Sequence, residues 1–162
     1  MSEYQSVLIK GAKTTVEEKR EKAVLVGVER PGMRWNISSS LAELERLADT
    51  AGADTVAVTT QKLDSPNPRT FVGSGKVEEI SRLCRSTGAD LIIFDDELTP
   101  SQQSNLEKSV DRDLKVIDRT ALILDIFALH ATTKEGRLQV RLAQNQYLLP
   151  RLRGMWSHLA SN

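Results

Sequence analysis

Four short apolar segments alternate with helix-like segments over the first 118 residues, and this alternation constrains the fold more than any other feature. The apolar segments are residues 23–28, 55–60, 89–94 and 114–117. The first is an unbroken run rich in β-branched residues, which is typical of a central strand covered on both faces. Strands that alternate with helices predict a parallel sheet with right-handed crossovers.

The helices between these strands have recognisable ends. One of the three serines at 38–40 can cap the first helix, and Glu43 stands three residues after the last of them, as a capping box requires. A long loop at 61–76, which contains two prolines and two glycines, precedes the second helix. We expect Thr99 to cap the third helix, because Pro100 favours the first helical position.

Residues 118–156 read as two helices joined by a polar tip at 132–136. Thr120 can cap the first helix, and the second is expected to begin around Arg137. The second helix carries leucines on one stripe, as the seam of a two-helix hairpin requires. These leucines are Leu138, Leu142, Leu149 and Leu152.

The predicted fold class is therefore α/β: a small four-stranded parallel sheet with flanking helices, followed by an antiparallel two-helix hairpin subdomain. We expect an α/β subdomain over residues 1–118 and a hairpin subdomain over 119–158. Residues 159–162 are expected to start a linker.

The single cysteine, Cys84, cannot form an internal disulfide, which favours a reducing compartment. The chain has no apolar run of membrane-spanning length and no signal-peptide core at its start. We therefore expect a cytoplasmic protein without a membrane partner. A length of 162 residues is sufficient for a packed core without a structural metal.

The charge of the chain is unevenly distributed although its net charge is zero. Between positions 134 and 158 lie five basic residues and one acidic residue, Glu135. A basic terminal element of this kind can face an anionic partner such as RNA. The alternative is an amphipathic helix whose solvent face happens to be rich in arginine.

In an open parallel sheet, ligands usually bind at the carboxyl ends of the strands. One candidate there is Gly73-Ser74-Gly75-Lys76, because glycines at a helix start let backbone N–H groups face a phosphate. The spacing does not match a Walker A loop, since Thr70 stands where the motif needs glycine and Val77 where it needs Ser or Thr. The alternatives are a weak nucleotide site, a contact to a nucleic-acid phosphate, or a tight turn.

The acidic run Asp95-Asp96-Glu97 follows the third strand and could hold Mg²⁺. We favour a different interpretation, in which these carboxylates lie near the positive end of the next helix, and predict no metal site. Nothing in the sequence reads as a complete catalytic site. His130 and His158 lack partners at useful spacing, and Cys84 lies on the apolar face of a helix. Trp35 and Trp156 could stack on bases or serve as packing or interface residues.

Several linked motifs resemble the N-terminal region of the HflX family of ribosome-associated GTPases. They are TAGAD, PNPRTFVGSGKVEEI, ADLIIFDDELTPSQQSNLE, KVIDRTALILDIFALHATTKEGRLQV and LAQNQYLLPRLRGMWSHL. The resemblance extends from about Leu41 to Leu159. It implies a small parallel α/β subdomain, a two-helix subdomain and a separate GTP-binding domain beyond them.

The resemblance also implies a partner. Members of the family bind the large ribosomal subunit and help to split or rescue stalled ribosomes, and the hairpin tip approaches the peptidyl transferase centre. With the charge pattern, this gives a set of candidate RNA-binding residues. They are Thr132, Thr133, Lys134, Gly136, Arg137, Arg141, Arg151 and Arg153. Nucleotide binding, including that of ATP, is also ascribed to this region of the family, with Gly73, Ser74, Gly75 and Lys76 as local candidates.

The sequence contains no GxxxxGK[ST] motif, so GTP hydrolysis is not assigned to these residues. GTP and Mg²⁺ are expected as cofactors of a GTPase domain outside them. The chain is then an N-terminal segment of a longer protein or a short relative, and its last residues favour the first. We predict a monomer that docks on large-subunit RNA and modulates its own GTPase domain. The alternative is a domain that binds or hydrolyses nucleotides itself.

Overall fold

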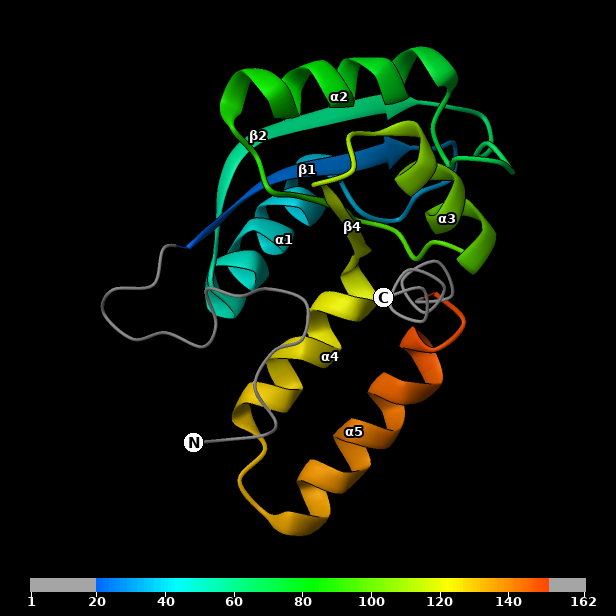
Figure 1. Ribbon diagram of the computed structural model, residues 1–162. Coiled ribbons are helices and arrows are strands. Elements are labelled where there is room, and N and C mark those ends of the chain that lie inside the picture. Colours follow the sequence, from blue (N-terminus) through cyan, green and yellow to red (C-terminus); the bar gives the residue numbers. More distant parts are fainter. Residues whose placement is uncertain (1–19, 152–162) are drawn as a thin grey trace.

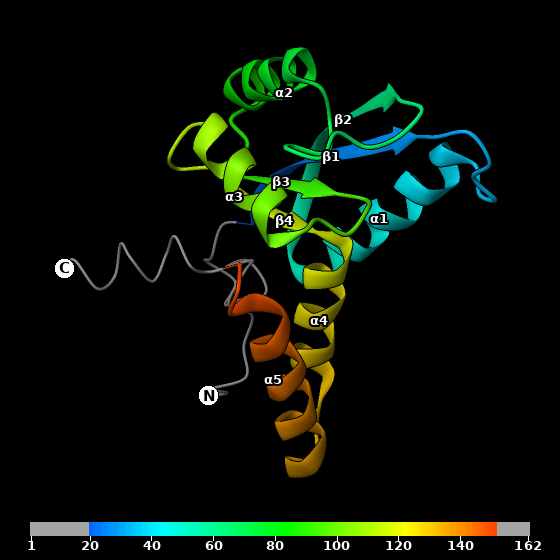
Figure 2. The ribbon, with the colours of Figure 1, turned by 90° about the vertical axis from the view of Figure 1, so that its right-hand side faces the viewer.

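The computed structural model describes residues 20–151, and in it the four predicted strands form one parallel sheet (Figures 1 and 2). The strands are β1 (Glu21–Glu29), β2 (Ala53–Lys62), β3 (Leu91–Phe94) and β4 (Lys115–Asp118), in the order β2-β1-β3-β4. The predicted class, a four-stranded parallel sheet with flanking helices, is confirmed.

Strand β1 is central because its sequence can be buried on both faces. All of its residues are buried except Lys22 and Glu29, which are partly exposed. It pairs with β2 on one side and with β3 on the other, and its register with β2 shifts between Ala23 and Val24. An uninterrupted apolar run is what a strand in this position requires.

The helices cover the two faces of the sheet separately (Figures 1 and 2). One face is packed by α1 (Ile37–Ala51) and by the first hairpin helix, and the other by α2 (Ser74–Thr87) and α3 (Pro100–Ser109). The chain leaves β1 toward one face and β3 toward the other. The gap between the carboxyl ends of β1 and β3 is therefore the topological switch point, where open α/β sheets place their ligands.

Two of the predicted helix caps can be compared directly. Thr99 caps α3 in a complete capping box with Gln102, as predicted. The predicted capping box at the start of α1 is wrong, because the helix begins at Ile37 and the side chain of Asn36 accepts from the backbone N–H of Ser38 at 2.7 Å. Asparagine is as favourable as serine at a helix N-cap, so Asn36 was an equally good candidate in the sequence, and the three serines lie inside the helix.

The hairpin consists of α4 (Arg119–His130) and α5 (Lys134–Leu148), which run side by side in opposite directions and project from the sheet (Figure 2). Thr120 does not cap α4. Asp118, the last residue of β4, does so by accepting from the N–H of Ala121 at 3.0 Å. Helix α5 begins at Lys134, earlier than predicted, because Thr133 caps it.

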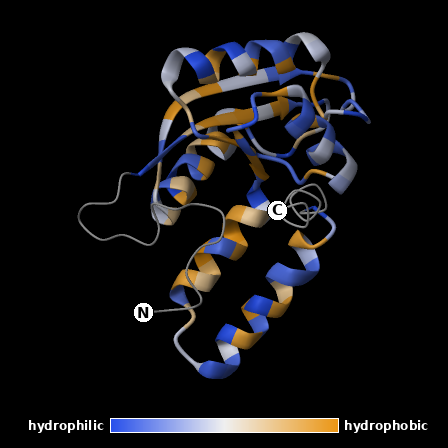
Figure 3. Cartoon of the chain, in the orientation of Figure 1, coloured by the Kyte–Doolittle hydropathy of each residue, from blue (hydrophilic) through white to orange (hydrophobic). Residues whose placement is uncertain are grey.

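The predicted leucine seam is also wrong. Leu138, Leu142 and Leu149 are 52%, 59% and 51% exposed, and Leu152 lies outside the described residues. The side of α5 that faces inward carries a second helical stripe, which the leucines obscured in the sequence. Its buried or half-buried members are Val140, Ala143, Gln144, Tyr147 and Leu148. Figure 3 shows the resulting mixture of hydrophobic and hydrophilic residues along α5.

Some predictions fall on residues outside the described range. They concern Arg153, Trp156, His158 and the linker expected at 159–162. Among the helices of residues 20–151, none has the length and apolar character needed to cross a membrane.

Candidate functional site

The glycine-rich segment Gly73–Lys76 lies where predicted, at the start of α2, but its polar groups are engaged within the protein. The N–H of Gly73 donates to the side chain of Gln61 at 3.1 Å. The ammonium of Lys76 lies 2.8 Å from Glu79 and 3.2 Å from Thr59, and its hydrogen bond lowers the pKa of the Glu79 carboxyl. The segment also follows β2, at the edge of the sheet, rather than the switch point.

The preceding loop, residues 63–73, is held in one conformation by internal hydrogen bonds and by α3. Asn67 and Phe71 exchange backbone hydrogen bonds of 2.9 and 2.8 Å. Gln102 of α3 donates to the carbonyl of Asn67 at 3.0 Å. Phe71 has a φ of 67°, which is unusual for a residue with a side chain, and its ring packs edge-on against Phe94. The loop is an ordered wall of the carboxyl edge.

Two of the three acidic residues after β3 pair with arginines, and the third, Glu97, accepts from the Thr120 hydroxyl at 3.1 Å, so our interpretation of the run as a helix-end feature is wrong. Asp95 lies 2.5 Å from Arg119 at the start of α4 and accepts from Ser40 at 2.6 Å. Asp96 lies 2.8 Å from Arg30. Within residues 20–151, no cluster of carboxylates, cysteines and histidines has the geometry of a metal site.

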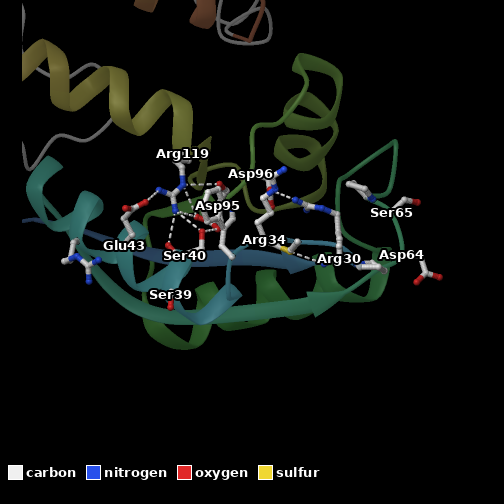
Figure 4. Close-up of a pocket in the computed structure, with 16 residues that line it drawn as sticks. Arg30, Arg34, Ser39, Ser40, Glu43, Asp64, Ser65, Asp95, Asp96 and Arg119 are labelled. Atoms are coloured by element: carbon white, nitrogen blue, oxygen red, sulfur yellow. Dashed lines mark hydrogen bonds and ion pairs between the residues drawn. The ribbon is translucent and has the colours of Figure 1, made fainter.

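Arg119 links three elements at this edge. Its guanidinium contacts Asp95 of the β3–α3 loop, Glu43 of α1 at 2.6 Å and the carbonyl of Ser40 at 2.9 Å (Figure 4). Arg119 lies at the first position of α4, so these bonds fix the direction in which the hairpin leaves the sheet.

Asp118 forms a second anchor for the hairpin. Its side chain is fully buried and accepts from the backbone N–H groups of Leu98, at 2.8 Å, and Ala121, at 3.0 Å. The hydroxyl of Tyr147 on α5 also donates to it. One carboxylate thus joins the sheet, α4 and α5.

Arg151, one of the predicted RNA contacts, completes this anchor. Its guanidinium lies 3.6 Å from the centre of the Tyr147 ring and donates to the carbonyls of Tyr147, at 2.9 Å, and Leu98, at 2.5 Å. These bonds give Arg151 a structural role at the base of the hairpin. We name the set Asp118, Arg119, Tyr147 and Arg151 the hairpin base.

The other predicted RNA contacts among the described residues lie at the far end of the hairpin. The Thr133 hydroxyl accepts from the N–H of Gly136 at 2.9 Å, and Arg137 donates to the carbonyl of Thr132. Lys134 and Arg141 are exposed, and Arg137 is half-buried. We name the set Thr132, Thr133, Lys134, Gly136, Arg137 and Arg141 the hairpin tip.

An open cleft of about 970 Å³ lies at the switch point, and the sequence did not predict it. Its walls are the loop after β1 and the loop after β2, and its floor contains the Asp95–Arg119 and Asp96–Arg30 pairs (Figure 4). Trp35 lines it and is 71% exposed, which excludes a packing role among the described residues. The sequence feature that could have indicated this cleft is RPGMRWN at 30–36, in which a turn is followed by an arginine and a tryptophan.

Cys84 lies in the core, as predicted, at 2% exposure. Burial raises the pKa of its thiol to about 11, so the reactive thiolate is scarce at neutral pH.

Family comparisons match most of the chain. Residues 38–128 match the model of the family described as GTP-binding GTPase N-terminal, and residues 130–162 match the model described as GTP-binding GTPase Middle Region. The first match alone covers more than half of the chain.

Individual proteins match over a similar range. The chain is 51% identical over 140 residues to a GTPase HflX of Flavobacterium psychrophilum, covering 86% of this chain and 33% of that protein. It is 47% identical over 119 residues to a GTPase HflX of Escherichia coli, covering 74% and 28% respectively. The chain thus spans about a third of the length of the relatives it matches.

The fold also occurs in solved structures. A GTP-binding protein from Sulfolobus solfataricus in complex with GDP superposes with a TM-score of 0.61 at 23% identity, covering 85% of this chain and 40% of that one. A structure described as SsGBP and GDP complex superposes with a TM-score of 0.64 at 24% identity, covering 83% and 37% respectively.

Proposed function

The chain belongs to the GTP-binding GTPase N-terminal family, as the N-terminal region of an HflX-type GTPase, and from this premise we propose that it docks on large-subunit ribosomal RNA. The observation that carries the proposal is a basic hairpin tip on an arm that is held rigidly at its base. Docking of this kind supports ribosome splitting or rescue by the longer protein, near the peptidyl transferase centre.

The arm is suited to present its tip because its base is fixed. Asp118 and Arg119 connect it to the sheet by buried or half-buried hydrogen bonds. The twelve residues of α4 extend about 18 Å at 1.5 Å per residue, so the tip lies well outside the α/β subdomain. Recognition by a rigid element loses less conformational entropy on binding than recognition by a flexible one.

The charges on the outer part of α5 favour an anionic partner. Lys134 is exposed and forms no hydrogen bond or ion pair with another residue between 20 and 151. Arg137 and Arg141 lie on the turns that follow, and Glu135 is the one carboxylate of the helix. Lysine and arginine side chains bind phosphates by releasing condensed counterions, so binding is expected to weaken as salt rises.

The test is co-sedimentation of the chain with purified large ribosomal subunits over a salt series. We expect the double variant Lys134→Ala/Arg137→Ala to bind more weakly and with a salt-dependence slope smaller by about two. The matched control is Arg82→Ala/Arg85→Ala, which removes two exposed charges from α2 on the far side of the molecule. Equal affinity and slope for the tip variant and the unaltered chain would disprove the role of the tip.

A second proposed function, control of the protein's own GTPase domain, is favoured by the exposed leucines of α5. Leu138, Leu142 and Leu149 lie on one stripe of the helix, and about two-thirds of the length of the relatives lies outside the matched part. We propose that the GTPase domain of the longer protein, with its GTP and Mg²⁺, contacts this stripe. The test is GTP turnover by the full-length protein, which Leu138→Ser/Leu142→Ser should alter and Arg82→Ala should not.

Nucleotide binding by the chain itself has less support from geometry, because Lys76 is already paired with Glu79. Calorimetric titration of the chain with ATP tests it. Heat that saturates in the unaltered chain and disappears in Lys76→Ala would restore this alternative.

A further inference from the structure

Trp35 lies in the loop between β1 and α1, at the switch point of the sheet, and is the most exposed large hydrophobic residue between positions 20 and 151. An indole left in water is a large apolar area that packing does not explain. Exposed aromatic groups beside a cleft mark contact surfaces. The question is which partner the surrounding groups would accept.

The conformation of the loop leaves the Trp35 side chain exposed to solvent. Gly32 adopts a φ of +80° in a turn after Pro31, and the N–H of Met33 donates to the carbonyl of Arg30 at 3.4 Å. Arg30 is itself fixed, because it pairs with Asp96 and lies 5.8 Å from the centre of the Phe71 ring. Both ends of the loop are therefore anchored, since Asn36 caps α1 immediately after Trp35.

Some charged side chains that line the cleft form ion pairs within the protein, and others have no such partner among the described residues. Arg30 and Arg119 are paired with the carboxylates of the floor. Arg34 and Arg46 also line the cleft, and their guanidinium groups have no hydrogen-bond or ion-pair partner among residues 20–151. Of the lining carboxylates, Asp64 alone is unpaired within the same range. The available charge is thus positive and lines the same cleft as the indole.

We propose that this cleft binds a nucleotide of single-stranded RNA, with its base stacked on Trp35 and the flanking phosphates on Arg34 and Arg46. Stacking on an aromatic ring together with cationic contacts to the backbone is how proteins bind unpaired RNA. The inference extends the proposed docking on ribosomal RNA by naming a second contact, on the sheet instead of the hairpin.

The openness of the site favours a nucleotide within a strand over a free one. An indole that is 71% exposed can cover one face of a base and leaves the other face to a neighbouring base. The two available arginines come from different elements, the loop after β1 and the middle of α1, so they suit phosphates on either side of the stacked nucleotide.

The experiment measures binding of a labelled single-stranded oligoadenylate to the full 162-residue chain by fluorescence anisotropy, with AMP as a competitor. A parallel titration uses Trp156→Phe, in which Trp35 is the remaining tryptophan and reports stacking through quenching. We expect Trp35→Ala to weaken oligoadenylate binding about tenfold or more and Trp35→Phe to retain most of it. Arg34→Gln and Arg46→Gln should each reduce the salt slope by about 0.7, and the control Arg82→Gln should not.

Equal oligoadenylate affinities for Trp35→Ala and the unaltered chain would overturn the inference. Competition by AMP at the same concentration as the oligoadenylate would also overturn it, in favour of a mononucleotide pocket. The result is separable from the hairpin proposal. If Lys134→Ala/Arg137→Ala loses ribosome binding while Trp35→Ala binds oligoadenylate normally, only the proposal of an RNA site in the cleft is refuted. If oligoadenylate quenches Trp35 but the chain does not bind ribosomes, only the proposal of docking on ribosomal RNA is refuted.

Discussion

The base and the tip of the α4–α5 hairpin are constructed in opposite ways. At the base, the polar side chains are buried or half-buried and hydrogen-bonded to neighbouring elements, as with Asp118, which is fully buried and accepts three hydrogen bonds. At the tip, charged side chains face solvent, as with Lys134 and Arg141. The difference separates two tasks along one pair of helices: the base determines stability and orientation, and the tip is available to partners.

The strongest challenge to this comparison is Asp118→Ala. It leaves the N–H of Leu98 buried without an acceptor and removes the cap of α4, so we expect a loss of about 4 kcal/mol in the free energy of unfolding. Urea denaturation measures it. If that variant does not fold, Asp118→Asn keeps an acceptor oxygen and should lose about half as much. A loss below 1 kcal/mol in both variants would contradict the structural role of the base.

Tyr147→Phe tests the same base with one bond removed. We expect a loss of about 2 kcal/mol, because the hydroxyl donates to a charged, buried acceptor. Burial, together with this hydrogen bond, raises the pKa of the Tyr147 phenol well above its ordinary value of 10. The folded state holds this proton more tightly than the unfolded chain, so the contribution is complete below about pH 10 and is lost as the pH rises above it.

Alkaline denaturation curves give the readout. The unaltered chain should lose stability more steeply above pH 10 than Tyr147→Phe does. Parallel curves would show that the phenol does not ionise at a different pH in the folded state.

Alanine substitutions at two glycines in first helical turns are expected to change the free energy of unfolding by about 1 kcal/mol in opposite directions. A Cβ on Gly136 would lie 2.9 Å from the Thr133 hydroxyl that caps α5, so Gly136→Ala should destabilise the tip by loss of that cap. Nothing lies within 4 Å of a Cβ on Gly75, so Gly75→Ala should stabilise α2. Thermal unfolding distinguishes the two, and a shared sign would show that helix propensity alone decides.

The smallest stability effect is expected at the tip itself. Lys134→Ala removes an exposed charge that has no ion pair among the described residues, so its free energy of unfolding should change by less than about 0.5 kcal/mol. The same variant should lower the salt slope of ribosome binding by about one. A large loss of stability in Lys134→Ala with unchanged ribosome binding would show that the tip stabilises the fold and does not bind the partner.

The order of strands and helices could be predicted because it depends on local patterns. The run from Ala23 to Val28 can be buried only in a central strand, and Thr99-Pro100 is a helix start whatever surrounds it. The leucines of α5 misled because α5 carries two apolar stripes, and periodicity alone does not say which one faces α4. The face of α5 that turns inward is the one that carries Tyr147, because the Tyr147 hydroxyl donates a hydrogen bond to Asp118.

The site was less predictable because its pairs are distant in sequence. Arg119 meets Asp95 and Glu43 across separations of 24 and 76 residues, and no local pattern announces such partners. The acidic run therefore read as a helix-end feature. Trp35 was visible in the sequence, but its exposure depends on the turn at Gly32 and on the pairing of Arg30, which only the fold displays.

The order of the strands has a consequence for how the chain is made. The central strand β1 is synthesised before the other described strands, and both neighbours that pair with it come later, so the sheet can grow outward from β1 as the chain emerges from the ribosome. The last strand, β4, ends in Asp118, the residue that seats the hairpin. Because the hairpin is anchored at the end of β4, we expect its packing against the sheet to come late in the folding of this part of the chain.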